Sequence, residues 1–134
     1  MEASDTPEAG HQKSPAEIEQ LIKDEGGSRL IDVRQEYEFD AAHLAGAERI
    51  GLEELADRRG ELDESEPVIF YCRVGTRSDM AAEAFMAAGY DVSTIKGGIT
   101  AWVVEGKEIE PEDGYVSEPG EAAAILEARA RSKS

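Results

Sequence analysis

The sequence lacks the features typical of disulfide-bonded, membrane-spanning or exported proteins. There is one cysteine among 134 residues, which excludes an internal disulfide and leaves Cys72 as either a small buried hydrophobe or a reactive thiol. No apolar run approaches the roughly 20 residues that cross a bilayer. The first 13 residues are polar and acidic, without the apolar core of a secretory signal. We therefore expect a cytoplasmic protein that binds no membrane.

Basic residues are also scarce. There are 14 Lys and Arg against 30 Asp and Glu, for a net charge of −16. Such a surface repels phosphate backbones, so we expect no nucleic-acid partner. Two interpretations of the acidity remain: a well-solvated surface, or adaptation to a high-salt habitat in which ions screen the self-repulsion.

The length fits one compact domain. Residues 1–13 lack periodicity and predict a disordered tail. The domain itself is expected over residues 14–106. Residues 107–134 predict an acidic linker followed by a C-terminal helix near residues 121–131.

Within that domain, predicted strands and helices alternate. Strands are expected at residues 29–33, near 50, at 67–71 and at 91–95. Helices are expected from a cap at Ser14 to Gly26, and over residues 35–42, 52–60, 76–88 and 99–105. This alternation predicts an α/β fold with a mainly parallel central sheet flanked by helices on both faces.

The most informative segment is Cys72-Arg73-Val74-Gly75-Thr76-Arg77-Ser78. It lies between the carboxyl end of a buried strand and the start of a helix, where ligands bind in open α/β sheets. Its backbone N–H groups can converge on an anion. Residues 68–78 contain two arginines and no acid, in a chain of net charge −16. Cations and a helix start favour a thiolate, so we interpret Cys72 as a nucleophile.

The same loop can stabilise an anionic leaving group such as sulfite, and the negative charge of a persulfide. This chemistry requires no metal and no organic cofactor. A dyad of Cys72 with His43 is an alternative. The competing interpretation is that His43 only holds its own loop by hydrogen bonds.

Four ordered motifs resemble the rhodanese family. They are the loop at residues 72–78, the strand signature at 31–34, the stretch containing Glu38, Phe39, His43 and Gly46-Ala47, and the motif at 97–102. The resemblance implies a doubly wound α/β fold and transfer of sulfane sulfur through a persulfide on Cys72. The donor would be thiosulfate or another persulfide. The acceptor would be cyanide, a small thiol or a protein thiol.

The resemblance also implies roles for single residues. Residues 73–77 would supply the N–H groups of the loop and Ser78 would fix its geometry. Arg77 would brace the loop and help to hold the anion, while Arg73 would position the donor. Supporting roles fall to Asp32, Arg34, His43 and Trp102. Val74 departs from the small polar residue common in similar members, and makes the mouth of the loop more apolar.

Two other functions remain open. Phosphatases and arsenate reductases use a similar loop, but with the spacing C-x5-R. Here Cys72 to Arg77 is C-x4-R, and no general acid is evident although Asp79 is close. A binding or redox-sensing module is the non-enzymatic alternative.

Overall fold

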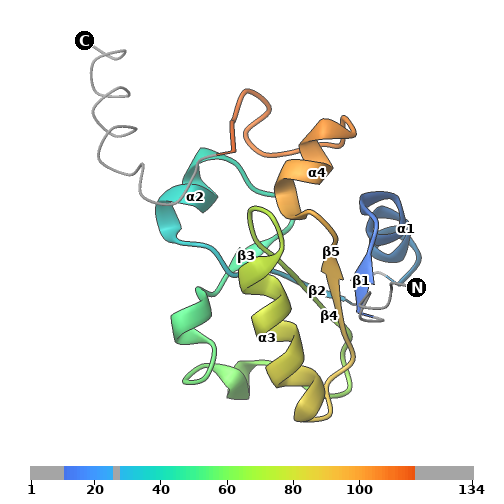
Figure 1. Ribbon diagram of the computed structural model, residues 1–134, viewed down its shortest axis with the longest axis vertical. Helices are drawn as coiled ribbons and strands as arrows, with labels where there is room; N and C mark the ends of the chain where they lie inside the picture. Colours follow the sequence, from blue (N-terminus) through green and yellow to red (C-terminus); the bar gives the residue numbers. More distant parts are fainter. Residues whose placement is uncertain (1–10, 26–27, 117–134) are drawn as a thin grey trace, which may run out of the picture.

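A central sheet of five parallel strands organises the part of the chain that the computed structural model describes, residues 11–25 and 28–116 (Figure 1). The strands lie side by side in the order β1-β5-β4-β2-β3, and every neighbouring pair is parallel. Their bounds are β1 Gln12–Lys13, β2 Arg29–Asp32, β3 Glu48–Arg49, β4 Val68–Tyr71 and β5 Val92–Ile95. The predicted α/β fold with a parallel sheet is confirmed.

The helices follow the predicted positions closely, with one exception. They are α1 Pro15–Glu25, α2 Glu36–Ala41, α3 Thr76–Ala87 and α4 Gly98–Val104. The predicted helix at 52–60 is wrong: two short 3-10 turns, η2 Leu52–Glu54 and η3 Arg59–Glu61, occupy this stretch. The helical spacing of Leu52, Leu55 and Ala56 is not continued, because residues 57–61 are charged or glycine.

Alternate residues of the strands pack into two separate cores. Val68 and Phe70 of β4 face one core, which α3 covers with Phe85. Ile69 and Tyr71 face the other core, which α1 and α4 cover. All four residues of β4 are buried, as expected for a strand covered on both faces. The sheet therefore has helices on both sides, with α3 lying across it in Figure 1.

A reciprocal capping box starts α1, as the sequence predicts. The Glu17 N–H donates to the Ser14 hydroxyl oxygen at 3.1 Å, and the Ser14 N–H donates to the Glu17 carboxylate at 2.9 Å. These bonds satisfy two N–H groups that the helix itself leaves without acceptors.

The described structure begins inside the stretch predicted as a tail. Gln12 and Lys13 pair with β5 as an edge strand, and His11 is buried. Residues 11–13, predicted as part of the tail, therefore contact the domain at the edge of its sheet. Residues 1–10 lie outside the described residues.

The segment 107–116 is also not a free linker. Backbone bonds of 2.9 and 2.8 Å join His43 and Glu110 in both directions. The Trp102 indole N–H donates to the Glu108 carbonyl at 2.8 Å, and Ile109 packs against the core. Tertiary contacts thus hold an acidic segment on the domain. The predicted helix at 121–131 lies outside the described residues. Across residues 11–25 and 28–116, no helix is long and apolar enough to cross a membrane.

Candidate active site

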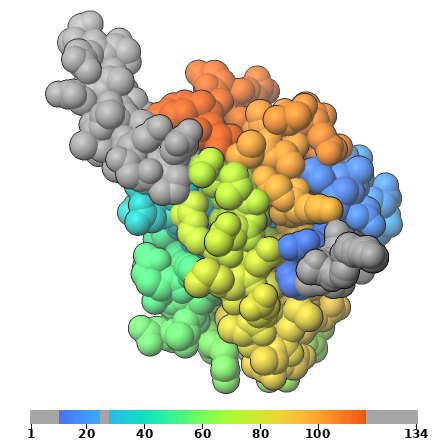
Figure 2. All heavy atoms as spheres, in the orientation of Figure 1, coloured from blue at the N-terminus to red at the C-terminus, as the bar shows by residue number. Residues whose placement is uncertain are grey.

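The loop between β4 and α3 is fixed from both sides. Gly75 has a φ of 117°, a left-handed conformation that favours glycine, and α3 begins at the next residue. The Ile99 N–H donates to the Cys72 carbonyl at 2.9 Å, and the Thr100 N–H donates to the Arg73 carbonyl at 3.1 Å. Figure 2 shows this part of the chain, in yellow-green, beside α4, in orange. The first turn of α4 therefore anchors the loop.

Gly98 is what allows that close approach. Its φ is 64°, and a Cβ atom there would collide with the carbonyl groups of Cys72 and Arg73. The motif at 97–102 is thus part of the site architecture.

The sulfur of Cys72 faces donors of its own loop. The Gly75 N–H lies 3.0 Å from Sγ and the Ser78 N–H lies 3.4 Å from it. The Ser78 hydroxyl is 3.5 Å from Sγ and also 3.1 Å from the Gly75 carbonyl oxygen, to which it can donate. Cys72 is only 1% exposed and borders the core that α3 covers. Its side chain is buried, but the polar groups aimed at the sulfur can stabilise negative charge on it.

Arg77 forms a two-pronged ion pair with Glu38. Its two terminal nitrogens donate to the two carboxylate oxygens at 2.8 and 3.0 Å. Hydrogen bonding to Glu38 raises the pKa of Arg77 above its ordinary value, against the opposing effect of burial. Glu38 is fully buried, which disfavours its charge, but the bonds from Arg77 and Gln35 hold its pKa below the ordinary value.

Glu38 therefore connects α2 to the loop. Its Oε1 accepts the Gln35 N–H at 3.1 Å at the start of α2 and the Arg77 guanidinium at 2.8 Å. The arrangement supports bracing as the role of Arg77, since both of its terminal nitrogens contact Glu38. Sequence reasoning cited Glu38 only within a motif, because nothing in the sequence pairs residues 38 and 77.

Asp32 and Arg34 form a second, fully buried pair at the end of β2. Arg34 Nη2 donates to Asp32 Oδ2 and to the Ala42 carbonyl, each at 2.6 Å. Burial disfavours the charge of Arg34, but its bonds to Asp32 raise its pKa above the ordinary value. Its guanidinium carbon lies 5.7 Å from the ring centre of Tyr71, the residue before Cys72. The pair therefore lies beside the last residue of β4.

His43 and Trp102 contact the segment 107–116. The His43 ring stacks on Phe39 at 3.8 Å, and its Nε2 lies 3.6 Å from the Glu110 carboxylate. These contacts fit a histidine that holds its loop, and they offer no support for a dyad with Cys72.

The remaining loop residues form the rim. Val74 is 44% exposed, Thr76 is exposed, and Arg73 is half-buried. Within the described residues, Arg73 Nε is buried and has no hydrogen-bond partner. Of the loop residues, Gly75 and Ser78 contact the Cys72 sulfur, whereas Arg77 contacts Glu38.

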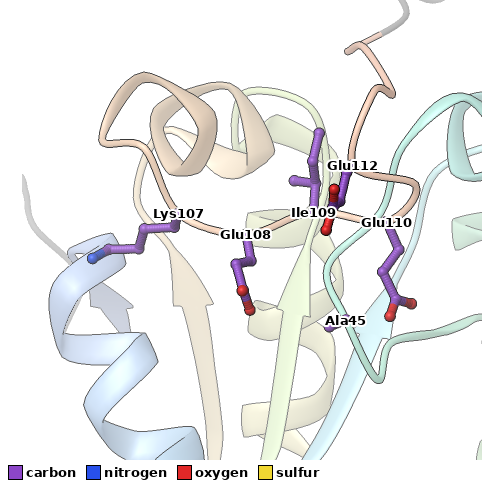
Figure 3. Close-up of a pocket in the computed structure, with 6 residues that line it drawn as sticks. All are labelled: Ala45, Lys107, Glu108, Ile109, Glu110 and Glu112. Carbon is purple, nitrogen blue, oxygen red and sulfur yellow. The ribbon is translucent and has the colours of Figure 1, made fainter.

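An acidic hollow lies apart from this loop. It has a volume of about 330 Å³ and is lined by Ala45, Lys107, Glu108, Ile109, Glu110 and Glu112 (Figure 3). Lys107 points toward α1, where it donates to Glu19 at 2.9 Å. None of its lining residues comes from the loop 72–78. In the part of the chain described, no group of three or more His, Cys, Asp or Glu could hold a metal ion.

The chain is similar in sequence to several known proteins. The chain is 37% identical over 76 residues to the uncharacterized protein YqhL of Bacillus subtilis, covering 56% of this chain and 60% of that protein. It is 30% identical over 90 residues to the thiosulfate sulfurtransferase GlpE of Pseudomonas aeruginosa, covering 66% of this chain and 80% of that protein. The match to the probable adenylyltransferase/sulfurtransferase MoeZ of Mycobacterium tuberculosis spans only 25% of that longer protein.

The fold is also similar to that of solved structures. A rhodanese-related protein from Thermoplasma volcanium matches with a TM-score of 0.68 and 25% identity, over 74% of this chain and 96% of that one. The family model of the rhodanese-like domain matches residues 14–105. With its parallel sheet and its cysteine loop, the chain therefore belongs to the rhodanese-like domain family.

Proposed function

We propose that this protein is a sulfurtransferase that carries sulfane sulfur as a persulfide on Cys72. One observation carries the proposal: the N–H groups of Gly75 and Ser78 converge on Cys72 Sγ at 3.0 and 3.4 Å. A thiol that served only as packing would gain little from two backbone donors. A sulfur that becomes anionic during turnover would gain much from them.

The loading step is a displacement at sulfur. The Cys72 thiolate attacks the outer sulfur of thiosulfate or of another persulfide. A new S–S bond forms as the old one breaks, and the electron pair leaves with sulfite or with a thiolate. The outer sulfur of the enzyme persulfide then carries the negative charge. We expect the N–H groups of the loop to stabilise this charge as well.

The unloading step returns the enzyme to its starting form. Cyanide, or the thiolate of a small molecule or protein, attacks the outer sulfur of the persulfide. The enzyme S–S bond breaks and its electron pair returns to Cys72. Because Cys72 is the sole cysteine, no internal thiol can compete for this sulfur.

Burial of Cys72 protects the loaded state. Its side chain is 1% exposed, whereas Val74 on the rim is 44% exposed. The sulfur is therefore covered, and a donor or acceptor must gain access to it before sulfur is transferred. The ion pair of Arg77 with Glu38 also supports a sulfur atom as the occupant, since it commits both terminal nitrogens to the scaffold.

Turnover with thiosulfate and cyanide tests the proposal. We expect thiocyanate to form in wild-type protein and to be absent in Cys72→Ser, with no hydrolysis of a chromogenic phosphate ester by either. Phosphate ester hydrolysis without thiocyanate would instead favour a phosphatase. Absence of both activities, with alkyl persulfide donors as well, would leave a binding module and refute the proposal.

A further inference from the structure

An apolar groove lies between η2 and α3, away from the cysteine loop. It has a volume of about 270 Å³, and its lining includes Leu52, Leu55, Met80, Ala84 and Phe85, with Arg59 as its single charged residue. Met80 is 56% exposed, and Ala84 is exposed as well. In Figure 2 the green surface that includes η2 borders the yellow-green surface of α3. Exposed apolar surface of this kind marks a contact site, which we call the η2–α3 groove.

The turn η2 also lines a second hollow, between η2 and α2. This α2–η2 hollow has a volume of about 490 Å³, and its charged lining residues are Glu36, Asp40, Glu53, Glu54 and a single base, Arg49. Arg49 lies 3.5 Å from Glu54, and the other three acids are exposed. A ligand that fills the groove and extends across η2 therefore meets apolar side chains on one side and carboxylates on the other. It needs an apolar part and a cationic part close together.

The sequence of residues 117–134 supplies both parts. Its large apolar residues are Ile125 and Leu126. Residues 128–134 contain no acid and three bases, Arg129, Arg131 and Lys133, in a chain of net charge −16. All of these residues lie outside the described structure. In charge and in apolar content, the segment is therefore complementary to the two surfaces beside η2.

The described part of the chain ends within reach of these surfaces. The Tyr115 N–H donates to the carbonyl of Ala41, the last residue of α2, at 3.2 Å. Since α2 lines one side of the α2–η2 hollow, this hollow leads from α2 to η2. The chain from Val116 to Ile125 spans up to about 30 Å when extended. Its attachment also raises the local concentration of the segment to about the millimolar range, so a small contact area is enough for binding.

We propose that residues 117–134 bind the domain of their own chain, with Ile125 and Leu126 in the η2–α3 groove and the bases at 129–133 over the α2–η2 hollow. The inference is independent of the proposed function, because neither surface includes a residue of the loop 72–78. The bound segment shields Met80 from solvent. Met86, on the same helix, is 44% exposed and does not line the groove.

Oxidation of the two methionines by hydrogen peroxide tests the proposal. Every protein carries Cys72→Ser, so that no thiol consumes the oxidant, and sulfoxide is measured by peptide mass. We expect Met80 to react at most about one third as fast as Met86, although its exposed fraction in the described structure is larger. Replacing both Ile125 and Leu126 by Ser should raise the rate at Met80 at least about threefold and leave Met86 unchanged.

The matched control replaces an exposed apolar pair elsewhere. Val103 and Val104 of α4 are 37% and 80% exposed and do not line the groove. Replacing both by Ser should leave the rate at Met80 unchanged. The same rate at Met80 with and without Ile125 and Leu126 would overturn the proposal, and so would an equal rise in the control.

Dilution identifies the occupant of the groove. Protection by a segment of the same chain does not depend on protein concentration, whereas protection by a second copy does. We expect the ratio of the two oxidation rates to stay constant over an about hundredfold dilution. Loss of protection on dilution would assign the groove to a second copy and overturn the proposal.

The charge of the segment is tested separately with Arg129→Gln combined with Arg131→Gln. We expect the rate at Met80 to rise about twofold at low salt, and the difference from the parent protein to disappear at about 1 M salt, where the attraction is screened. No difference at low salt would contradict the proposal, because charge is what selects this segment for η2. If the variant without Ile125 and Leu126 does not fold, this one decides.

Discussion

The Glu38 carboxylate accepts two parallel hydrogen bonds, of 2.8 and 3.0 Å, from the guanidinium of Arg77. The two residues are 39 positions apart, and Glu38 is completely buried. The pair ties α2 to the start of α3, directly after the loop that holds Cys72. Geometry of the loop therefore depends on an ion pair that does not itself touch the sulfur.

Arg77→Lys should impair sulfur transfer even though it keeps the charge. Lysine cannot form two parallel bonds to a carboxylate, so the loop loses its brace. We expect kcat/KM for thiosulfate to fall at least about tenfold, since small misplacements of reacting groups are costly. Arg29→Lys is the matched control: Arg29 binds both oxygens of Glu48, at 2.7 and 3.1 Å, away from the loop. Similar losses in the two variants would contradict a special role for Arg77.

Glu38 should make the protein sensitive to acid. Because its pKa in the folded protein lies below the ordinary value of 4.5, its contribution is complete above that pH. The contribution is lost as the pH falls through the lowered value. Denaturant unfolding between about pH 6 and pH 3 should therefore show a shallower loss of stability in Glu38→Gln than in wild type. Glu38→Gln should also lower the free energy of unfolding at about pH 6 by roughly 2–4 kcal/mol.

Glu83→Gln, an exposed change on α3, controls for removal of one negative charge. If the free energy of unfolding depends on pH in the same way in wild type and in Glu38→Gln, loss of the pair with Arg77 is not the cause of the acid sensitivity.

Gly98→Ala should damage both stability and activity. The new Cβ meets the carbonyls of Cys72 and Arg73, and the φ of 64° is itself unfavourable for alanine. We expect a loss of more than about 2 kcal/mol in denaturant unfolding, combining overpacking with backbone strain. Gly46→Ala separates the two effects, because Gly46 has a φ of 83° but a Cβ added there would meet no atom within 4 Å. It should cost only about 1 kcal/mol and keep full activity. Equal losses of stability and activity in Gly98→Ala and Gly46→Ala would show that close packing of α4 against the loop is not required.

Tyr71 should resist ionisation until the protein unfolds. Burial raises its pKa well above the ordinary value of 10.0, and its hydroxyl oxygen accepts the Leu44 N–H at 3.1 Å. A group with a raised acid pKa contributes stability below about pH 10 that is lost as the pH rises further. Tyr71→Phe should therefore move alkaline unfolding to higher pH, while at about pH 7 it costs about 1–2 kcal/mol by leaving that N–H without its acceptor. Unfolding followed by circular dichroism checks both; an unchanged alkaline midpoint would contradict this account.

Local patterns predicted most of the fold. The apolar run ending at Tyr71, the cap at Ser14 and the glycine after α3 each indicate an element boundary within about two residues, because these signals act over one turn or one strand. The structure of residues 52–60 was not predicted correctly, because short 3-10 turns have no distinctive periodicity.

The rest depended on contacts distant in sequence. The composition of residues 107–116 is typical of a linker, yet Trp102 and His43 hold that segment by bonds that no local pattern encodes. For the same reason, the loop 72–78 was evident from its position and charge, whereas the partnership of Glu38 with Arg77 was not.

Intact mass after incubation with thiosulfate tests the central claim most directly. The account predicts that wild-type protein gains one sulfur atom, that cyanide removes it, and that Cys72→Ser gains none. An unchanged wild-type mass with thiosulfate and with alkyl persulfide donors, or an equal gain in Cys72→Ser, would show that the N–H groups around Cys72 do not serve a sulfur carrier.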